Sequence, residues 1–427
     1  NETARLQQKA MYKDFSPRTK KPALERDAAW EHAFAEFEKV KTDYAHQKHV
    51  EELANRTNAE KFRSLAKDVL FEPMRAIKTA WDLSAPGRQG IVFAMSHPII
   101  TTKEHIPEML RAFGSEAAAA RTDAAIRRRK YAKLGDLAKL DLTNHGDKLT
   151  HREEEIASRL LRKIPGFKGS NRAYITLLNM QRATMFDMMV QAHPEAMTLA
   201  KAKAIAHAVN VATGRGEAKS VASAMGLAAK VLWAAQLLLS RAQLLTGEPM
   251  WHADAAVRKQ IAKEMYLRPL ASVAALMALG VMAGGSLDLD PRSSDFGKLK
   301  FGNTRIDLMG GMLQIPVMLA KLFSGTKKDA RGVVVKDSRG AWDEFANFFR
   351  KKLAPVPALA FNVLPPHKNV VGEPTTVASV LQETLTPLSW NDFYEAAKEQ
   401  GIAKGSLFGL MSIFGLGVQT YDSQRKK

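Results

Sequence analysis

The chain has 427 residues, of which 46% are hydrophobic and 25% are charged, and this ordinary globular composition excludes a disordered tail. It contains no cysteine, which excludes disulfides, thiolate metal sites and cysteine nucleophiles. The 63 Lys and Arg against 44 Asp and Glu give a net charge of +19, so we expect a polyanionic partner such as nucleic acid or an anionic membrane. The alternative is a basic surface that is solvated or neutralised by an acidic neighbour.

Residues 1–77 predict an N-terminal arm followed by a long charged helix. Pro17 and Pro22 interrupt a basic stretch at the start. Aromatic side chains then recur at helical spacing, at Trp30, Phe34, Phe37 and Tyr44. Such a narrow apolar stripe favours packing along one partner in a bundle or coiled coil. Because the chain begins at Asn1 and shows no secretory signal pattern, we expect it to be a piece of a longer polypeptide.

The next part of the chain predicts a helix over residues 62–83, ended by Pro86 and Gly87, and a second over residues 103–134. The second helix carries the densest basic cluster in the chain: Arg121, Arg127, Arg128, Arg129 and Lys130. These positions spread around more than half of a helix, so one face cannot bury them all. We predict contact with DNA phosphates, and a solvated helix face is the equally weighted alternative.

The polar stretch that follows holds the one His-carboxylate cluster that suggests a metal site: His145, His151, Glu153, Glu154 and Glu155. No pair has the His-x-x-x-His spacing of a zinc protease. Thr150 and Glu153 instead have the spacing of a capping box, so we interpret the cluster as a helix start and predict no metal ion.

Two further helices are expected after this. The first restarts near Ser170, whose hydroxyl is predicted to cap it, and its methionine-rich stripe indicates adaptable core. The second covers residues 195–213. We interpret Gly214-Arg215-Gly216 as its C-terminal turn, because the spacing of a phosphate-binding loop and a preceding strand are both missing.

An apolar region begins near Ser220 and includes residues 269–287, which carry no charged side chain. As a helix this stretch would reach about 28 Å, close to the apolar thickness of a bilayer. Gly280 and Gly284 form a GxxxG pair, which allows close helix contact in lipid. The pattern indicates either a membrane-spanning helix or a core helix, and we predict partner or membrane contact at the two glycines.

A change to strand and turn chemistry follows. Residues 298–301 and 304–308 flank Gly302-Asn303, which predicts a small β-hairpin near residues 298–308. Gly310-Gly311 then permits a sharp exit into an apolar helix over residues 312–323. The fold class is therefore mainly α, a multi-helix assembly with a small β-hairpin insertion.

Residues 326–427 predict an extended, proline-rich connector with short helices. The final apolar stretch, residues 405–418, contains several glycines and is typical of a partner-facing or membrane-interface segment, with Phe408 and Phe414 as contacts. The predicted domains are residues 1–77, the helical core with the hairpin at 78–325, and the C-terminal part at 326–427.

Several stretches occur in the order of a known family: DLSAPGRQG at 82–90, IPGFKGSNRAY at 164–174, VNVATGRG at 209–216, SRAQLL at 240–245 and SSDFGKLKFGNTRIDLMGG at 293–311. Together they resemble the large polyvalent protein associated domains found near the end of very large, multifunctional bacteriophage proteins. The resemblance covers about residues 78–325. This sequence departs from the family's pattern just before SRAQLL: the family has a turn there, whereas VLWAAQLLL is expected to continue as a helix. It implies a virion or co-injected phage protein and no catalytic residues.

No GxSxG, Walker, dinucleotide or metal-ligand motif is present, so we expect neither an enzyme nor a cofactor. We expect a structural part of an internal virion (ejection) protein, located in the virion interior and injected into the host envelope or cytoplasm. Its expected partners are portal, tail or internal proteins and further copies of itself. DNA is a further expected partner, and so is a membrane after ejection. The alternatives are the C-terminal segment of a co-injected antirestriction or host-takeover protein, and a membrane-pore component of the ejection conduit.

Overall fold

The computed structural model of the chain describes residues 51, 81–143, 166–193, 197–216, 234–251, 253–328, 332–336, 341–350, 352–353 and 406–421. The chain divides into two units, Asn1–Thr57 and Asn58–Lys427, and all the elements below belong to the second. They are mostly helices with small antiparallel sheets, which confirms the predicted fold class. The predicted N-terminal helix, the capping box at Thr150 and the His145 cluster lie outside the described residues.

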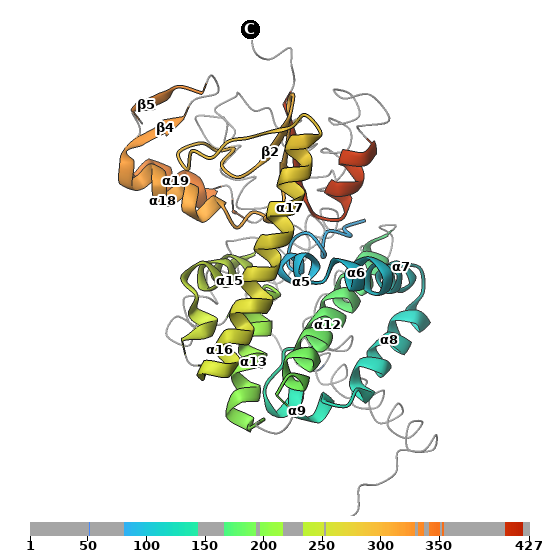
Figure 1. The fold of residues 1–427 in the computed structure, drawn as a ribbon. Coiled ribbons are helices and arrows are strands. Elements are labelled where there is room, and N and C mark those ends of the chain that lie inside the picture. Colours follow the sequence, from blue (N-terminus) through green and yellow to red (C-terminus); the bar gives the residue numbers. More distant parts are fainter. Residues whose placement is uncertain are drawn as a thin grey trace, which may run out of the picture. The chain divides into compact units, whose positions relative to one another are not determined.

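The longest described α-helix, α12 (Phe167–Gln191), lies at the centre of a helical layer. It packs against α7 (Ile106–Gly114), α8 (Glu116–Arg128) and α13 (Leu199–Ala212), as Figure 1 shows. Its apolar stripe fills the core with the predicted methionines and their neighbours, including Leu177, Met185, Phe186, Met189 and Val190. Burial of this stripe is what holds the layer together, because apolar area removed from water is the main favourable contribution to folding.

The predicted start of α12 is wrong by one turn. The helix begins at Phe167, directly after Gly166, whose φ of +83° is a conformation that glycine adopts easily. Ser170 therefore lies inside the first turn, where it is buried, and its hydroxyl caps no helix. Gly166 is itself the N-cap residue, and no side chain accepts a hydrogen bond from the first turn of the helix there.

The single helix predicted for residues 103–134 is also wrong, because the structure divides this stretch. After α6 (Pro98–Ile100) comes a π-helical turn, η2 (Thr101–His105), and then α7. Ser115 adopts an extended conformation and its hydroxyl accepts a hydrogen bond from the Ala118 amide at 3.2 Å, which starts α8. The chain then continues into α9 (Ala132–Leu137). The break allows α7 and α8 to pack against each other and both against α12.

Helix α13 begins at the cap residue Thr198, whose hydroxyl accepts from the Lys201 amide at 3.3 Å. It ends before Gly214, which has a φ of +82°, so the interpretation of this glycine as part of a helix-terminating turn is confirmed. Next to α13 lie α15 (Ala235–Thr246) and the short 3-10 helix η4 (Glu248–Met250).

One continuous helical segment joins the helical layer to the sheet. It consists of α16 (Ala255–Ala262), the π-helical turn η5 (Lys263–Leu267) and α17 (Arg268–Met282). In Figure 1 it runs as a yellow helix from α13 toward β2. At its N-terminal end α16 packs on α13, and α17 packs on α5 (Ile91–Ser96) and on the first two strands of the sheet.

The predicted hairpin is confirmed as β2 (Leu299–Phe301) and β3 (Thr304–Asp307), an antiparallel pair with Leu299 opposite Ile306. It belongs to a larger sheet of order β1-β2-β3-β6, with β1 (Ser286–Leu287) on one side and β6 (Gly417–Thr420) on the other. Residues 406–413, just before β6, are helical. The C-terminal strand, which the sequence did not predict, thus completes the sheet.

A second small layer follows the sheet. It contains α18 (Gln314–Ser324), the antiparallel strands β4 (Thr326–Lys328) and β5 (Val334–Lys336), and α19 (Ala341–Arg350). Gly310 and Gly311 have φ values of +58° and +80°, which confirms the predicted sharp exit before α18. Helices α18 and α19 pack on each other, and α18 has no buried residue among those described.

Candidate interaction surfaces

One exposed apolar surface among the described residues lies on α17. Its solvent-facing arc, which we call the α17 face, consists of Leu267, Leu270, Ala271, Ala274, Ala275, Ala278, Leu279, Val281 and Met282. The exposed fraction is 64% for Leu267, 60% for Leu279 and 82% for Met282. Residues 269–287 carry no charged side chain, so the one ionic group within this stretch of helix is Arg268 at its start, whose side chain is 39% exposed and donates to Glu264. A contiguous bare apolar surface of this kind is typical of a contact site.

The opposite side of α17 is part of the core. Val273 is 4% exposed, and Met277, one turn further, packs against the same core cluster. The helix from Ala255 to Met282 is the one helix among the described residues that is long and apolar enough to cross a membrane. Only 11% of its most apolar stretch is buried inside the fold. The expectation of a core helix therefore holds for one side of α17 only.

The two glycines of the GxxxG pair have different surroundings. At Gly280 a Cβ atom would collide with Cδ2 of Leu299 and lie 2.9 Å from its Cδ1, so this glycine lets strand β2 pack against the helix. Gly284 lies beyond the helix end with a φ of +89°, and a Cβ there would meet nothing within 4 Å in the part of the chain that the structure describes. Gly280 thus already serves a contact within the chain.

The two C-terminal phenylalanines also contact the chain itself. Phe408 is 7% exposed in the main core cluster, with its ring centroid 6.2 Å from that of Phe301. Phe414 packs against a second cluster that contains Leu177, and its carbonyl accepts a hydrogen bond from the Gly87 amide at 2.8 Å. Both side chains were predicted as partner or membrane contacts, and the structure places them where they anchor residues 406–421 to the fold.

The predicted basic cluster runs from the middle of α8 to just past its end, and it contains both partly buried and exposed side chains. Arg127 donates to Asp123 at 2.7 Å, and Arg129 donates to Asp187 at 3.0 Å and to the Ile126 carbonyl. The Arg129 side chain is 11% exposed. The other three, Arg121, Arg128 and Lys130, are exposed. Burial raises the pKa of Asp187, although the Arg129 charge and its hydrogen bond act to lower it. Arg129 therefore has a structural role, and Arg121 and Lys130 are the better probes of DNA contact.

A buried polar centre, which the sequence did not predict, joins α12 to α13. Arg182 is fully buried, and its guanidinium donates to the Thr213 hydroxyl at 2.8 Å and to the carbonyls of Asp141 and Thr213. Burial lowers its pKa to about 10, and the nearby Arg215 acts in the same direction. The arginine remains charged at neutral pH, and its hydrogen bonds offset the cost of removing that charge from water.

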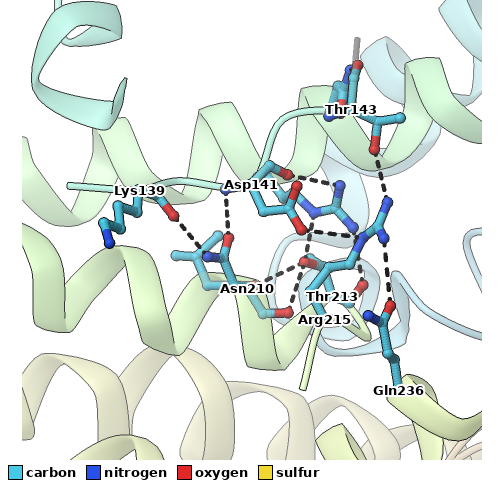
Figure 2. Close-up of polar contacts among 10 residues, drawn as sticks. Lys139, Asp141, Thr143, Asn210, Thr213, Arg215 and Gln236 are labelled. Atoms are coloured by element: carbon cyan, nitrogen blue, oxygen red, sulfur yellow. Dashed lines mark hydrogen bonds and ion pairs between the residues drawn. The ribbon is translucent and has the colours of Figure 1, made fainter. Parts of the chain in front are cut away.

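Figure 2 shows how this centre continues to the surface. The Asn210 side chain accepts from the Asp141 amide at 2.9 Å and donates to the Lys139 carbonyl at 3.0 Å. Arg215 lies 3.4 Å from an Asp141 carboxylate oxygen and donates to Thr143 at 2.9 Å. The segment after α9 is therefore held to α12 and α13 by side chains. The VNVATGRG stretch contains Asn210, Thr213 and Arg215. These closely spaced polar residues at the end of an otherwise apolar helix are the sequence feature from which the buried polar centre could have been predicted.

The stretches that carry the sequence resemblance converge around the loop before α5. The Gly87 carbonyl lies close to Gly310, and the Arg241 guanidinium donates to the Gly310 carbonyl. At Gly214 a Cβ atom would stand 3.0 Å from Cγ of Gln89. Burial raises the pKa of Tyr174, as does the charge of Asp82, while nearby arginines act to lower it. Glycines in this loop region allow close backbone approach, which explains why these stretches are rich in glycine.

The rings of His97 and His105 both lie next to the Phe93 ring, each with a centroid separation of 5.0 Å. His97 Nε2 lies 3.0 Å from a Glu264 carboxylate oxygen, and Arg268 donates to the same oxygen at 2.8 Å. Burial acts to raise the Glu264 pKa, but the bonds to His97 and Arg268 hold it below its usual value. Burial, with a contribution from the His97 charge, lowers the pKa of His105 to about 4, so His105 is neutral at pH 7. This group ties α5 to the helix of η5 and α17.

Within the ranges that the structure describes, no group of three or more His, Asp or Glu side chains lies close enough to hold a metal ion. No protein-family model, no curated protein and no solved structure matches the chain. The family resemblance therefore stays a prediction, and the surfaces described above carry the argument about function.

Proposed function

We propose that the chain is a structural, non-enzymatic part of a bacteriophage internal virion (ejection) protein that works by contacting other macromolecules. The observation that carries the proposal is the α17 face, an uncharged helical arc left bare on a domain that has its own buried core. A protein that acts alone in water gains nothing from such a surface, whereas a subunit of an assembly or a membrane-associated protein uses it for contact. The phage context comes from the sequence resemblance.

The second contact surface in this proposal is cationic. The chain has a net charge of +19, and Arg121 in the middle of α8 and Lys130 just after its end present exposed positive charges. Packaged or passing DNA is the polyanion that a virion protein meets, and cations near phosphates release counterions when they bind. We therefore propose that the stretch from Arg121 to Lys130 contacts DNA without sequence specificity.

The test is the affinity of the full chain for a fluorescent DNA duplex, measured by anisotropy over a series of salt concentrations. We expect the logarithm of the affinity to fall linearly with the logarithm of the salt concentration. The variant Arg121→Glu/Lys130→Glu should bind more weakly and with a smaller slope. Neither substitution removes a member of the Arg129–Asp187 pair, so we expect the variant to fold, and circular dichroism checks this.

The matched control is Lys259→Glu/Lys263→Glu, which changes the net charge equally but on a different helix, at two exposed positions. If the two double variants lose the same affinity, binding follows the total charge and α8 is not the contact. If the unmodified chain binds equally at low and high salt, or not at all, the DNA part of the proposal is wrong.

A membrane-pore role is the second candidate, favoured by the length and hydropathy of the helix from Ala255 to Met282. A spanning helix would have to expose all its sides to lipid or to other helices. Here Val273 and Gly280 pack on the domain itself, so this role requires α17 to separate from α5 and β2.

A further inference from the structure

We infer that the α17 face lies flat on an anionic lipid bilayer, so that the domain binds the membrane surface with α17 parallel to it and does not span it. The inference rests on the proposed function in one respect, that the α17 face is a contact surface. It goes further by naming the occupant of that surface and the orientation of the helix.

The first step is the geometry of the arc. From Leu267 to Met282 the helix rises about 22 Å at 1.5 Å per residue, and after Arg268 near its start, leucine, valine, methionine and alanine make up most of its exposed side. Its other side is fixed to α5 and the sheet through Val273 and Gly280. A helix with one free apolar side and one side held by protein suits the shallow position of an interfacial helix, whose apolar side enters the boundary between headgroups and acyl chains.

The second step is charge complementarity. Lys259 and Lys263 are exposed and lie four residues apart on the segment that leads into α17, and Leu267, the first exposed leucine of the arc, lies four residues further on. Two cations thus precede the apolar arc along the same helical segment. Lysine beside an apolar surface favours anionic lipid headgroups, because the ammonium groups reach the phosphates while the apolar side chains enter the acyl region.

The third step concerns the N-terminal end of the same segment. Trp251, just before α16, is 61% exposed. Exposed tryptophan is enriched at membrane interfaces, because its ring is apolar and its N–H group can bond to headgroups or water. A water-soluble partner subunit would also cover the leucines. The adjoining lysines and tryptophan favour a lipid surface as the occupant, and the experiment separates the two.

The experiment is flotation of the full chain with vesicles of phosphatidylglycerol and phosphatidylcholine, compared with vesicles of phosphatidylcholine alone. We expect the chain to float with the anionic vesicles and to stay largely unbound with the neutral ones. Leu270→Glu/Leu279→Glu should reduce partitioning by roughly tenfold or more, because two acidic groups replace exposed leucines in the arc. Leu110→Glu/Leu137→Glu, at exposed leucines on α7 and α9, is the matched control and should float as the unmodified chain does.

Charge reversal provides a second pair of test and control variants. Lys259→Glu/Lys263→Glu should lower binding to anionic vesicles by roughly tenfold or more, since each cation near such a surface contributes about fivefold. Arg121→Glu/Lys130→Glu changes the net charge by the same amount and should lower binding to anionic vesicles less. Equal loss in both variants, equal flotation with neutral vesicles, or no flotation at all would overturn the inference.

Orientation is measured with spin labels, which is practical because the chain has no cysteine of its own. Labels attached after Leu270→Cys and after Leu279→Cys should report the same shallow depth in the bilayer. A spanning helix would place these labels at clearly different depths, and that result would refute the flat orientation. If the leucine variants abolish self-association and leave vesicle binding intact, the face is occupied by a second copy of the chain, and the lipid assignment is wrong.

The two proposals fail separately. DNA affinity depends on Arg121 and Lys130, whereas flotation depends on Leu270, Leu279 and Lys259 with Lys263. Normal DNA binding without flotation would therefore leave the proposed function standing and remove only the lipid assignment.

Discussion

The Leu299 side chain of strand β2 lies directly over the backbone of Gly280 in α17. This contact joins the hairpin to the long helix and fixes which side of α17 remains exposed. It also connects two features that are separate in the sequence, the GxxxG pair and the hairpin. The consequences of this and three other relationships can be measured.

Gly280→Ala should destabilise the domain by about 1–3 kcal/mol, because the added Cβ would overlap the buried Leu299 side chain, which would have to shift within a packed core. The helix preference for alanine, about 1 kcal/mol, offsets only part of this cost. The measurement is chemical denaturation followed by circular dichroism.

The control is Gly114→Ala in α7, where a Cβ would meet nothing within 4 Å among the described residues. That variant should be as stable as the unmodified chain or slightly more so. If Gly280→Ala also leaves stability unchanged, α17 does not pack on β2 as described.

Phe408→Ala should cost about 3–5 kcal/mol, since the ring is 7% exposed in the core next to Phe301. Leu410→Ala, at a residue that is 51% exposed two positions further on, should change stability by less than about 1 kcal/mol. Hydrogen exchange should show faster exchange of the β6 amides in the first variant only. Equal effects of the two substitutions would mean that residues 406–421 face a partner and not the core.

Thr213→Val should destabilise the domain by about 1–3 kcal/mol, because it leaves the Nε donor of the buried Arg182 without its acceptor. Thr246→Val is a closely matched control, since that hydroxyl also bonds to a carbonyl four residues earlier but lies on the surface. Urea denaturation of both variants compares them directly. A cost at Thr246 as large as at Thr213 would show that the helix substitution alone accounts for the effect.

His105 should make the fold sensitive to mild acid. Its pKa is about 4 in the folded chain and 6.5 in its ordinary state, so below pH 6.5 the unfolded chain takes up a proton that the folded chain does not. The contribution of this group to stability is full above pH 6.5 and decreases as the pH falls toward 4, by about 3 kcal/mol in all.

The check is the free energy of unfolding at several pH values for the unmodified chain and for His105→Gln. The decrease between pH 6.5 and 4 should be smaller in the variant, because glutamine does not titrate. Parallel pH profiles for the two proteins would contradict the assignment of this acid sensitivity to His105.

The sequence by itself determined the helical class, the hairpin around Gly302-Asn303, the helix-terminating turn at Gly214 and the turn at Gly310-Gly311 that leads into α18. These features depend on neighbouring residues: periodic apolar side chains specify helices, and residues that tolerate a positive φ specify turns. Local chemistry also misled in two places. Ser170 resembled a cap but lies within α12, because Gly166 had already begun the helix, and Ser115 divided what looked like one helix.

Only the tertiary structure decided how distant segments share surfaces. Pairing of β6 with β3, burial of Phe408, the ion pair that removes Arg129 from the basic surface, and the enclosure of Arg182 all join residues far apart in the chain. The same holds for α17. Its sequence is apolar on all sides of the helix, and the packing of Leu299 and α5 decides which side is buried. A sequence pattern records which side chains avoid water, but which of them remain exposed depends on what the rest of the chain covers.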